Sequence, residues 1–327
     1  MGHDVTFTVV IATYNRANDL RDTMNSLAAV RTSYGWETIV VDNNSSDNTA
    51  SVVAEAGRGF PVALRYLFEP EQGKAAALNT AIRAATGDIL VFTDDDVRVP
   101  SDWLDRTHAG FERFGCDYVG GKALPLWCTP RPAWIPDRSS QHWGVLALLD
   151  YGPEPLEFGG RVPLGVNLAV RRAAFSQHNL WWDNAFDRKG GSLRGQGQRE
   201  WCIRARDAGL RGFYVPDMII YHTVQRDRLQ KRYFRRWMYW KGISRAVMYA
   251  QTGRDMEVPE RTELNFSKVP HIAGVPRYMY RHLVRSLLEM MRWSLLRRDS
   301  IAAFEHEMWL WFFAGVVRQR WIDRSRK

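Results

Sequence analysis

Cysteine is scarce in this sequence, and long apolar runs are missing from it. Only three cysteines, Cys116, Cys128 and Cys202, occur among the 327 residues. Their odd number and wide spacing suit neither a disulfide framework nor a zinc site, so we expect a reduced, cytoplasmic protein. The longest apolar run near the end, residues 308–317, is too short to span a bilayer. The first residues lack a basic and apolar leader pattern, and we expect no secretory signal.

A glycine-rich Gly-x-Gly-x-x-Gly turn is also missing after the first apolar run, which excludes a dinucleotide-binding fold of the NAD type. Charge is distributed unevenly instead. Residues 1–225 hold 23 Lys and Arg against 26 Asp and Glu, whereas residues 226–327 hold 22 against 10, so the net charges are −3 and +12. A nearly neutral body followed by a basic, tryptophan-rich region indicates that this region meets an anionic surface.

Apolar runs alternate with helix-forming segments in the first part of the chain. Strands are predicted at residues 7–12, 38–42 and 62–67 and in the run that leads to Asp94, with helices after Asn18, at 74–85 and after Pro100. This alternation predicts an α/β fold with a parallel sheet and crossover helices. A long, partly irregular segment is expected at 123–165. Later elements are strands at 165–170 and 212–221, a helix around 200–208, and a helical, basic region from Asp227.

Three acids, Asp94, Asp95 and Asp96, stand in a row where one apolar run ends. The carboxyl ends of strands in an open α/β sheet are where ligands bind. Three neighbouring carboxylates repel one another unless a cation or hydrogen-bond donors offset their charge, so a divalent ion with oxygen ligands is the natural partner. The alternative is a solvated acidic turn after the strand.

Six short segments carry a resemblance to a known family. They are residues 9–16, 40–49, 73–79, 87–96, 165–172 and 214–222. In this order they resemble inverting glycosyltransferases of family 2, and the resemblance covers about residues 5–245. It implies the GT-A fold, a Rossmann-like, mostly parallel sheet flanked by helices, for residues 1–225. The donor half would be about 1–122 and the acceptor half about 123–225, with a basic helical extension at 226–327.

The resemblance implies an enzyme that moves a sugar from a nucleotide-sugar donor to a glycan or lipid-linked acceptor, assisted by Mn²⁺ or Mg²⁺. Polysaccharide biosynthesis is a typical setting. The expected donor-binding residues are Thr13, Arg16, Asp42, Ser46, Asp47, Lys74, Asp94 and Asp95. Asp42 would contact the nucleobase, and Lys74 would face the diphosphate from a helix start. The expected metal ligands are Asp96 and His222, and Asn167 and Arg171 are expected on the acceptor side.

Structural roles are the alternatives at several of these positions. Asp42 is also a good helix cap among its Ser and Asn neighbours. A single histidine that ends a strand is often structural, and a lysine such as Lys74 is usually solvated. Asn167 and Arg171 also suit a structural turn.

The chain departs from the family pattern at its catalytic base. The family has a Glu-Asp pair before the late helix, and the alignment places Gly197 and Gln198 there. Because Gln cannot accept a proton at neutral pH, we predict Glu200 as the base, through a shifted loop. The alternatives are another carboxylate, Asp183 or Asp187, and a non-catalytic nucleotide-sugar-binding module.

Two amphipathic stripes with arginines nearby occur in the basic region. They are Tyr233, Trp237, Trp240 and Val247, and Leu287, Leu288, Met291 and Leu295. We predict an anionic membrane as their partner, which would place the protein peripherally on the cytoplasmic face. The alternatives are packing against the catalytic domain and nucleic-acid binding. Because no recognised nucleic-acid motif accompanies these stripes, we expect no nucleic-acid partner.

Overall fold

The computed structural model describes residues 6–137, 141–187, 192–255, 264–265, 269–297 and 300–325. The chain divides into two compact units. The first unit comprises residues 1–130, 137–187 and 197–225, and the second comprises residues 131–136, 188–196 and 226–327.

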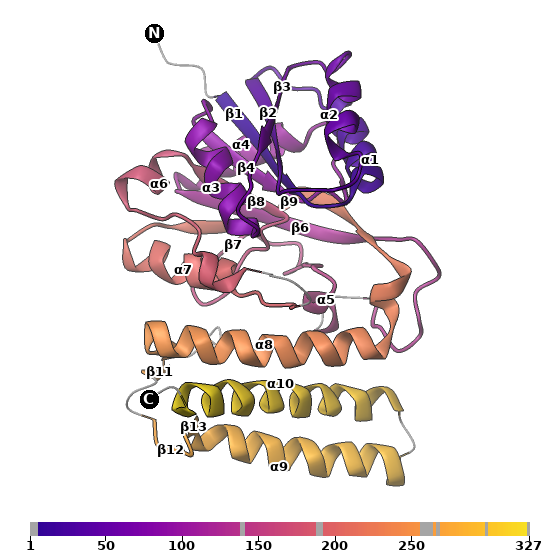
Figure 1. Ribbon diagram of the computed structural model, residues 1–327, viewed down its shortest axis with the longest axis vertical. Coiled ribbons are helices and arrows are strands. Elements are labelled where there is room, and N and C mark those ends of the chain that lie inside the picture. The colour runs from indigo at the N-terminus through magenta and orange to yellow at the C-terminus, as the bar shows by residue number, and fades with distance from the viewer. Residues whose placement is uncertain are drawn as a thin grey trace. The chain divides into compact units, whose positions relative to one another are not determined.

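The first unit is a sheet with helices on both faces (Figure 1). Its strands are β1 Thr6–Thr13, β2 Gly35–Asp42, β3 Ala63–Phe68, β4 Ile89–Thr93, β5 Val97–Arg98, β6 Tyr118–Trp127, β7 Leu156–Glu157, β8 Asn167–Arg171 and β9 Gly212–Val224. Its helices are α1 Ala17–Ala28, α2 Thr49–Gly57, α3 Lys74–Ala84, α4 Trp103–Phe114, α5 Gln141–Val145, α6 Ala173–Gln177 and α7 Gly197–Asp207, with a 3₁₀ turn, η1, at Asn184–Phe186.

The sheet order is β3-β2-β1-β4-β8-β6-β9-β5, and β7 pairs with β9. Strands β3, β2, β1 and β4 are mutually parallel, which confirms the parallel sheet predicted from the alternating pattern. Thr13 pairs with Asp42 and Ile11 with Thr93. The carboxyl ends of β1, β2 and β4 therefore meet at one edge of the sheet. Strand β8 is antiparallel to β4, whereas β6 and β9 are parallel to each other.

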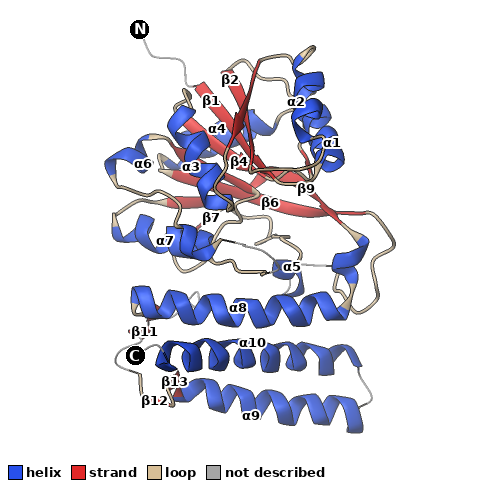
Figure 2. Ribbon diagram, in the orientation of Figure 1, coloured by secondary structure: helices blue, strands red, loops and turns tan. Residues whose placement is uncertain are grey.

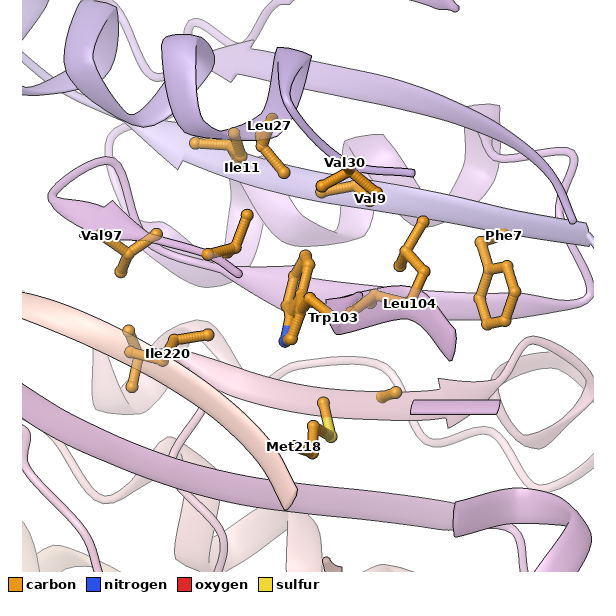
Figure 3. Close-up of a cluster of buried hydrophobic side chains, with 14 of the residues drawn as sticks. Phe7, Val9, Ile11, Leu27, Val30, Val97, Trp103, Leu104, Met218 and Ile220 are labelled. Carbon is orange, nitrogen blue, oxygen red and sulfur yellow. The ribbon is translucent and has the colours of Figure 1, made fainter. Parts of the chain in front are cut away.

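Apolar side chains cover both faces of β1 because successive residues point to opposite sides of the sheet. Phe7, Val9 and Ile11 belong to one buried cluster, which Figure 3 shows, and Val10 belongs to the other. Residues of α1, α2 and α4 complete the first cluster, and residues of α3, α6 and α7 complete the second. This two-sided burial explains why β1 is a continuous apolar run in the sequence.

The second unit is mainly helical (Figure 2). Its elements are a 3₁₀ turn, η2, at Arg226–Leu229, α8 Lys231–Thr252, α9 Arg277–Met291, a π-helical turn, η4, at Arg292–Leu296, and α10 Ser300–Ser325. Two short strand pairs join β10 Arg254–Asp255 to β11 Leu264–Asn265 and β12 His271–Ile272 to β13 Val275–Pro276. The described helices include none with the length and apolar character needed to cross a membrane.

Helix α10 lies between α8 and α9 (Figure 2). Two glycines allow α8 and α10 to approach closely. A Cβ atom on Gly242 would lie 2.0 Å from the carbonyl oxygen of Phe312, and one on Gly315 would lie 2.0 Å from that of Tyr239. Phe234 of α8 is buried on this packed side. The helical region predicted from residue 227 onward therefore has its own core.

Candidate functional site

The three consecutive acids follow β4 at the carboxyl edge of the sheet, where two cations meet them. The Lys74 ammonium donates to Asp94 Oδ1. Arg16 Nη1 donates to Asp96 Oδ2 at 2.6 Å and lies 3.4 Å from Asp95 Oδ1. Asp95 and Asp96 are buried, at 6% and 2% exposure, whereas Asp94 is half-buried. The structure therefore brings together five residues that the sequence assigned to donor or metal binding.

His222 joins this cluster from β9. Antiparallel pairing of β5 with β9 places His222 opposite Val97, directly after the acids. His222 Nε2 lies 3.2 Å from Asp96 Oδ1, and one ligand atom each of Asp94, Asp96 and His222 lies within 4.8 Å of the others. Among the described residues, the buried His222 Nδ1 has no hydrogen-bond partner. Two carboxylates and an imidazole fit a divalent cation such as Mn²⁺ or Mg²⁺.

Burial and neighbouring charges shift the pKa values of Asp94 and Asp95 in opposite directions. Burial and the adjacent Asp96 carboxylate raise the pKa of Asp95 above its usual range, although Arg16 opposes this rise. Burial alone would raise the pKa of Asp94 as well, but the Lys74 ammonium holds it below its usual value. Thr13 Oγ1 donates to Asp95 Oδ2 at 2.7 Å and fixes this carboxyl group at the end of β1.

Asp42 ends β2 at the same edge and is buried, with 3% exposure. Its Oδ1 accepts the backbone N–H of Ser45, and its Oδ2 accepts the Tyr66 hydroxyl, both at 2.8 Å. Burial and this carboxylate raise the pKa of Tyr66 to about 12. These bonds fix the turn after β2, which is a structural role, but neither reaches the first turn of α2 as a helix cap would. The role of Asp42 at a nucleobase stays a prediction.

Asp47 connects the beginnings of two helices. Its Oδ2 accepts the N–H of Ala17, the first residue of α1, at 3.0 Å, and its Oδ1 accepts the N–H of Thr49, the first residue of α2, at 3.1 Å. Burial would raise the pKa of Asp47, but the Thr49 hydroxyl, which also donates to Oδ1, and these backbone hydrogen bonds lower it. Ser46 N–H donates to the Asn15 side chain at 2.7 Å. Asp47 and Ser46 therefore fix the loops around the site, and their contact with a donor stays a prediction.

The start of α3 is held by two residues outside the predicted donor set. Asn43 Oδ1 accepts the Gly73 N–H at 2.8 Å, and the Asn43 amide donates to the Glu71 carbonyl at 2.7 Å. Both carboxylate oxygens of Asp187 lie within 3.0 Å of the Ala75 nitrogen. A Cβ atom on Gly73, whose φ is 147°, would lie 2.2 Å from Asp187. The helix N-terminus that we expected to face a diphosphate thus already has a carboxylate against it.

The sequence offered a signal for Asn43 but none for the capping role of Asp187. Asn43 directly follows β2, where polar residues after a strand mark the ligand edge. Asp187 is 112 residues from its partner in α3, and only the tertiary fold brings them together.

Asn167 is fully buried, with 0% exposure. Its Oδ1 accepts the Trp103 indole N–H at 3.0 Å, and its amide donates to the carbonyls of Lys122 and Met218 at 2.8 and 2.9 Å. The side chain thereby fastens β8 to α4, β6 and β9. Its acceptor and donor groups are used within the fold, which supports the structural alternative over a contact with an acceptor.

Arg171 lies at the other end of β8 from Asn167, and its place on the acceptor side stays a prediction. Asn167 pairs with Thr93, the last residue of β4, whereas Arg171 pairs with Ile89, the first. Its Nε donates to the Cys116 carbonyl at 2.9 Å. Because the acidic cluster follows Thr93, Arg171 lies at the opposite edge of the sheet.

Glu200 lies in the first turn of α7 and is buried, with 6% exposure. Arg204 Nε and Nη2 donate to its two carboxylate oxygens at 2.5 and 3.0 Å, and Nη2 also donates to the Trp181 carbonyl at 2.7 Å. The paired carboxylate supports a structural role, and the assignment of Glu200 as the base stays a prediction.

Gln198, which stands in place of the family's aspartate, and the alternative carboxylates Asp183 and Asp187 also have partners within the fold. Gln198 Nε2 lies 3.7 Å from Cys202 Sγ within α7. Asp183 Oδ1 accepts the Ala185 N–H at 2.8 Å and caps η1. Asp187 caps α3, as described above.

Comparisons with known proteins agree with the α/β architecture of the first unit. The family model described as glycosyl transferase family 2 matches residues 8–130. The chain is 31% identical over 114 residues to glycosyltransferase AglE of Haloferax volcanii, covering 35% of this chain and 38% of that protein. It is 29% identical over 127 residues to the succinoglycan biosynthesis protein ExoM of Rhizobium meliloti, covering 38% and 41%. The chain thus spans less than half the length of these relatives.

Solved structures resemble a larger part of the chain. Mannosyltransferase PcManGT from Pyrobaculum calidifontis, in complex with GDP-Man and Mn²⁺, has a TM-score of 0.62 at 19% identity and covers 98% of this chain and 88% of that one. TarS 1–349 of S. aureus, in complex with UDP-GlcNAc, has a TM-score of 0.51 at 13% identity and covers 98% and 91%. At these identities the likeness concerns the fold. Residues 8–130 therefore match the glycosyl transferase family 2 model, and the α/β architecture that contains them is the GT-A fold.

Proposed function

We propose that this protein is an inverting, metal-assisted glycosyltransferase that moves a sugar from a nucleotide-sugar donor to a glycan or lipid-linked acceptor. The observation that carries the proposal is the cluster of Asp94, Asp96 and His222 at the carboxyl edge of a domain that matches the family 2 model. Two structurally similar proteins were solved with GDP-Man and with UDP-GlcNAc, which supports a nucleotide-sugar donor. The class of reaction is hexosyl transfer.

Donor binding is assigned to the carboxyl edge of the sheet, in the donor half at about residues 1–122. The proposed set is Thr13, Arg16, Asp42, Ser46, Asp47, Lys74, Asp94 and Asp95. Lys74 is suited to a phosphate because its side chain is 48% exposed and its only described ion pair is with Asp94. An exposed ion pair of this kind contributes only about 0–1 kcal/mol, so the ammonium can exchange partners at low cost.

Asp94, Asp96 and His222 would hold Mn²⁺ or Mg²⁺. Such an ion supplies positive charge for the departing nucleoside diphosphate. Arg16 fixes the Asp96 carboxylate from the opposite oxygen, because it binds Oδ2 while His222 lies against Oδ1. The buried pairing orients both ligands before any ion arrives.

The acceptor half is assigned to about residues 123–225. Deprotonating an acceptor hydroxyl requires a base, and Glu200 is our proposal for it. To act, Glu200 must separate from Arg204, which now binds both of its oxygens. Gln198, in the place of the family's aspartate, favours a second function: a module that binds a nucleotide sugar without transferring it.

The setting of the reaction follows from the charge of residues 226–327. We propose that this basic region brings the protein to an anionic membrane on its cytoplasmic side, where a lipid-linked acceptor would lie. Polysaccharide assembly is the proposed process, and the similarity to ExoM, named a succinoglycan biosynthesis protein, supports it.

Thermal unfolding with UDP-, GDP- and dTDP-sugars, each with and without Mn²⁺, tests the donor proposal. A ligand that binds only the folded state raises the melting temperature, and we expect one nucleotide sugar to do so only with the metal. Equal melting temperatures under all conditions would refute donor binding. Release of nucleoside diphosphate in the presence of acceptor then distinguishes the enzyme from the binding module.

A further inference from the structure

Helix α9 carries more apolar residues than it buries. Met279 is 4% exposed, and the Tyr280 ring packs edge-on against Phe313 of α10 at a centroid distance of 5.2 Å. On its other side, Val284 is 55% exposed and Leu288 61%. Met291 and Leu295 continue this exposed row at 47% and 67%. The row is uncovered among the described residues, and its three members within α9, Val284, Leu288 and Met291, advance by four and three residues, which keeps them on one side of the helix.

A row of arginines accompanies these exposed apolar residues. Arg277, Arg281 and Arg285 are exposed and follow one another at four-residue intervals. Among the described residues, none of the three guanidinium groups has an ion pair or a hydrogen bond. Like charges at this spacing destabilise a helix by about 0.2–0.5 kcal/mol a pair. The helix therefore keeps an unfavourable charge arrangement that an anionic partner would offset.

The arginine row and two residues of the apolar row, Val284 and Leu288, border one groove of about 550 Å³ in the second unit. Its lining residues are Ile272, Arg277, Tyr280, Arg281, Val284, Arg285, Leu288 and Glu289. Three cations and four apolar or aromatic side chains thus line the same concave surface. This composition suits a ligand with an anionic end and an apolar end.

We infer that this side of α9 binds the surface of an anionic phospholipid bilayer. We define the α9 face as Arg277, Arg281, Arg285, Val284 and Leu288. The arginines contact lipid phosphates, and the apolar residues enter the boundary between headgroups and acyl chains, as in other basic amphipathic helices. The inference deepens the membrane association proposed above, because it names the surface that makes contact.

Charge favours a bilayer over a second copy of the chain, and side-chain exposure favours α9 over α8. If a second copy of the chain bound to the α9 face through its own α9 face, its arginines would repel this row of arginines. Residues 226–327 also carry a net charge of +12, from 22 Lys and Arg against 10 Asp and Glu. On α8, by contrast, the predicted stripe of Tyr233, Trp237 and Trp240 is half-buried. The exposed stripe is the one on α9.

Cosedimentation of the full chain with phosphatidylcholine vesicles, with and without phosphatidylglycerol, tests the inference. The first variant is R277Q/R281Q/R285Q, and the second is V284S/L288S. The matched control R58Q/R106Q/R113Q removes the same charge from exposed positions in the first unit. We expect binding only to vesicles with phosphatidylglycerol. Because each arginine near an anionic surface contributes about fivefold, the first variant should bind roughly a hundredfold more weakly. The control should bind like the parent.

Donor-induced thermal stabilisation, measured on the same variants, separates this inference from the glycosyltransferase proposal. It should be unchanged in both α9 variants. Failure of the parent to bind anionic vesicles at low salt overturns the inference and leaves donor binding intact. Undiminished vesicle binding by both variants overturns it as well. If the parent is a dimer in solution and V284S/L288S is a monomer, the α9 face is a self-association surface instead.

Discussion

Arg16 Nη1 lies 2.6 Å from Oδ2 of Asp96, a carboxylate that is only 2% exposed. Asp96, which is proposed to bind a divalent metal ion, is thus already paired with the single positive charge of Arg16. Removing one partner of a buried ion pair leaves the other charge without compensation, which destabilises a protein more than the pair itself stabilises it. The Arg16 side chain is 32% exposed, so water moderates this effect.

Arg16→Gln should therefore lower the free energy of unfolding by about 1–3 kcal/mol without metal. Added Mn²⁺ should restore part of this loss, because the ion would compensate the charge that Arg16 leaves. The measurement is the melting temperature with and without Mn²⁺ in both proteins. Arg58→Gln, an exposed change of the same kind, is the control. An equal Mn²⁺ effect in the variant and the parent would argue against a metal beside Asp96.

Asp96→Ala tests the metal assignment directly. The variant should lose Mn²⁺-dependent donor binding and transfer activity, because it removes an anionic ligand of a hard cation. Calorimetric titration of the donor with and without Mn²⁺ measures the effect. Asp22→Ala, which removes an exposed acid paired with Arg98, should behave like the parent. Full turnover by Asp96→Ala, or full activity of the parent in EDTA, contradicts the assignment.

Gly242→Ala should destabilise the helical unit. Its new Cβ would lie 2.0 Å from the Phe312 carbonyl oxygen, so α8 and α10 must move apart. Overpacking of this kind typically costs about 1–3 kcal/mol. Gly144→Ala is the control, because a Cβ there meets no atom within 4 Å. Chemical denaturation measures both variants, and equal midpoints would show that this helix crossing tolerates a methyl group.

Local patterns in the sequence were sufficient for the parallel half of the sheet and for the acidic edge. The apolar run of β1 indicates a buried strand, and the three acids after β4 mark the carboxyl end of one. Both features can be recognised from residues that are neighbours in the chain. Partners at long range are invisible to such patterns. The amide of Asn167 is used by residues from three other elements, and Asp187 reaches Ala75 across 112 residues.

The positions of Asn167 and Arg171 in the sheet likewise depend on partners at long range. Asn167 and Arg171 lie on one short strand, β8. The sequence motif that contains them does not determine whether β8 runs parallel or antiparallel to β4. Antiparallel pairing places Arg171 beside Ile89, far from the acids, and only the sheet register determines this. In the helical region, periodicity predicted amphipathic stripes on both α8 and α9, but their packing on α10 decides which stripe is exposed.

Glu37 provides a prediction for pH. Thr8, the Thr86 N–H and hydroxyl, and Arg65 donate to its carboxylate in β2. Burial would raise the pKa of Glu37, but these hydrogen bonds hold it below its usual value. A folded-state pKa below the unfolded one stabilises the protein at pH values above the unfolded pKa of about 4.3. This stabilisation disappears as the pH falls through the folded-state pKa.

Glu37→Gln should thus lower the free energy of unfolding by about 1–3 kcal/mol at pH 7, and by progressively less as the pH falls below about 4. Urea denaturation at neutral and acidic pH measures the difference. Glu55→Gln, an exposed acid paired with Arg21, is the control and should change stability little at either pH. A loss that is constant across pH would mean that the amide replaces the carboxylate's hydrogen bonds poorly for reasons of shape.

The catalytic base is the last prediction, and it depends on the Glu200 and Arg204 pair. If Glu200 deprotonates the acceptor, Glu200→Gln should keep donor affinity and lose turnover by about 10²–10⁴-fold. If the pair is structural, the variant should lose stability, because Arg204 would remain half-buried without its carboxylate. Turnover by the folded fraction would then stay at the parent's level. Measuring kcat, donor affinity and melting temperature on one preparation separates the two outcomes.

Gln198→Asp completes this experiment, because it restores a carboxylate where the family pattern has one. Gln198 lies on the first turn of α7, two positions before Glu200, so the substitution changes the available base without changing the helix. If turnover rises in Gln198→Asp and stays unchanged in Glu200→Gln, that result would mean that the parent protein has a weak catalytic base or none, and it would favour the binding-module hypothesis. If Glu200→Gln lowers turnover and Gln198→Asp does not raise it, Glu200 is supported as the base. A second carboxylate at position 198 would then add nothing, because Glu200 already takes the proton of the acceptor hydroxyl.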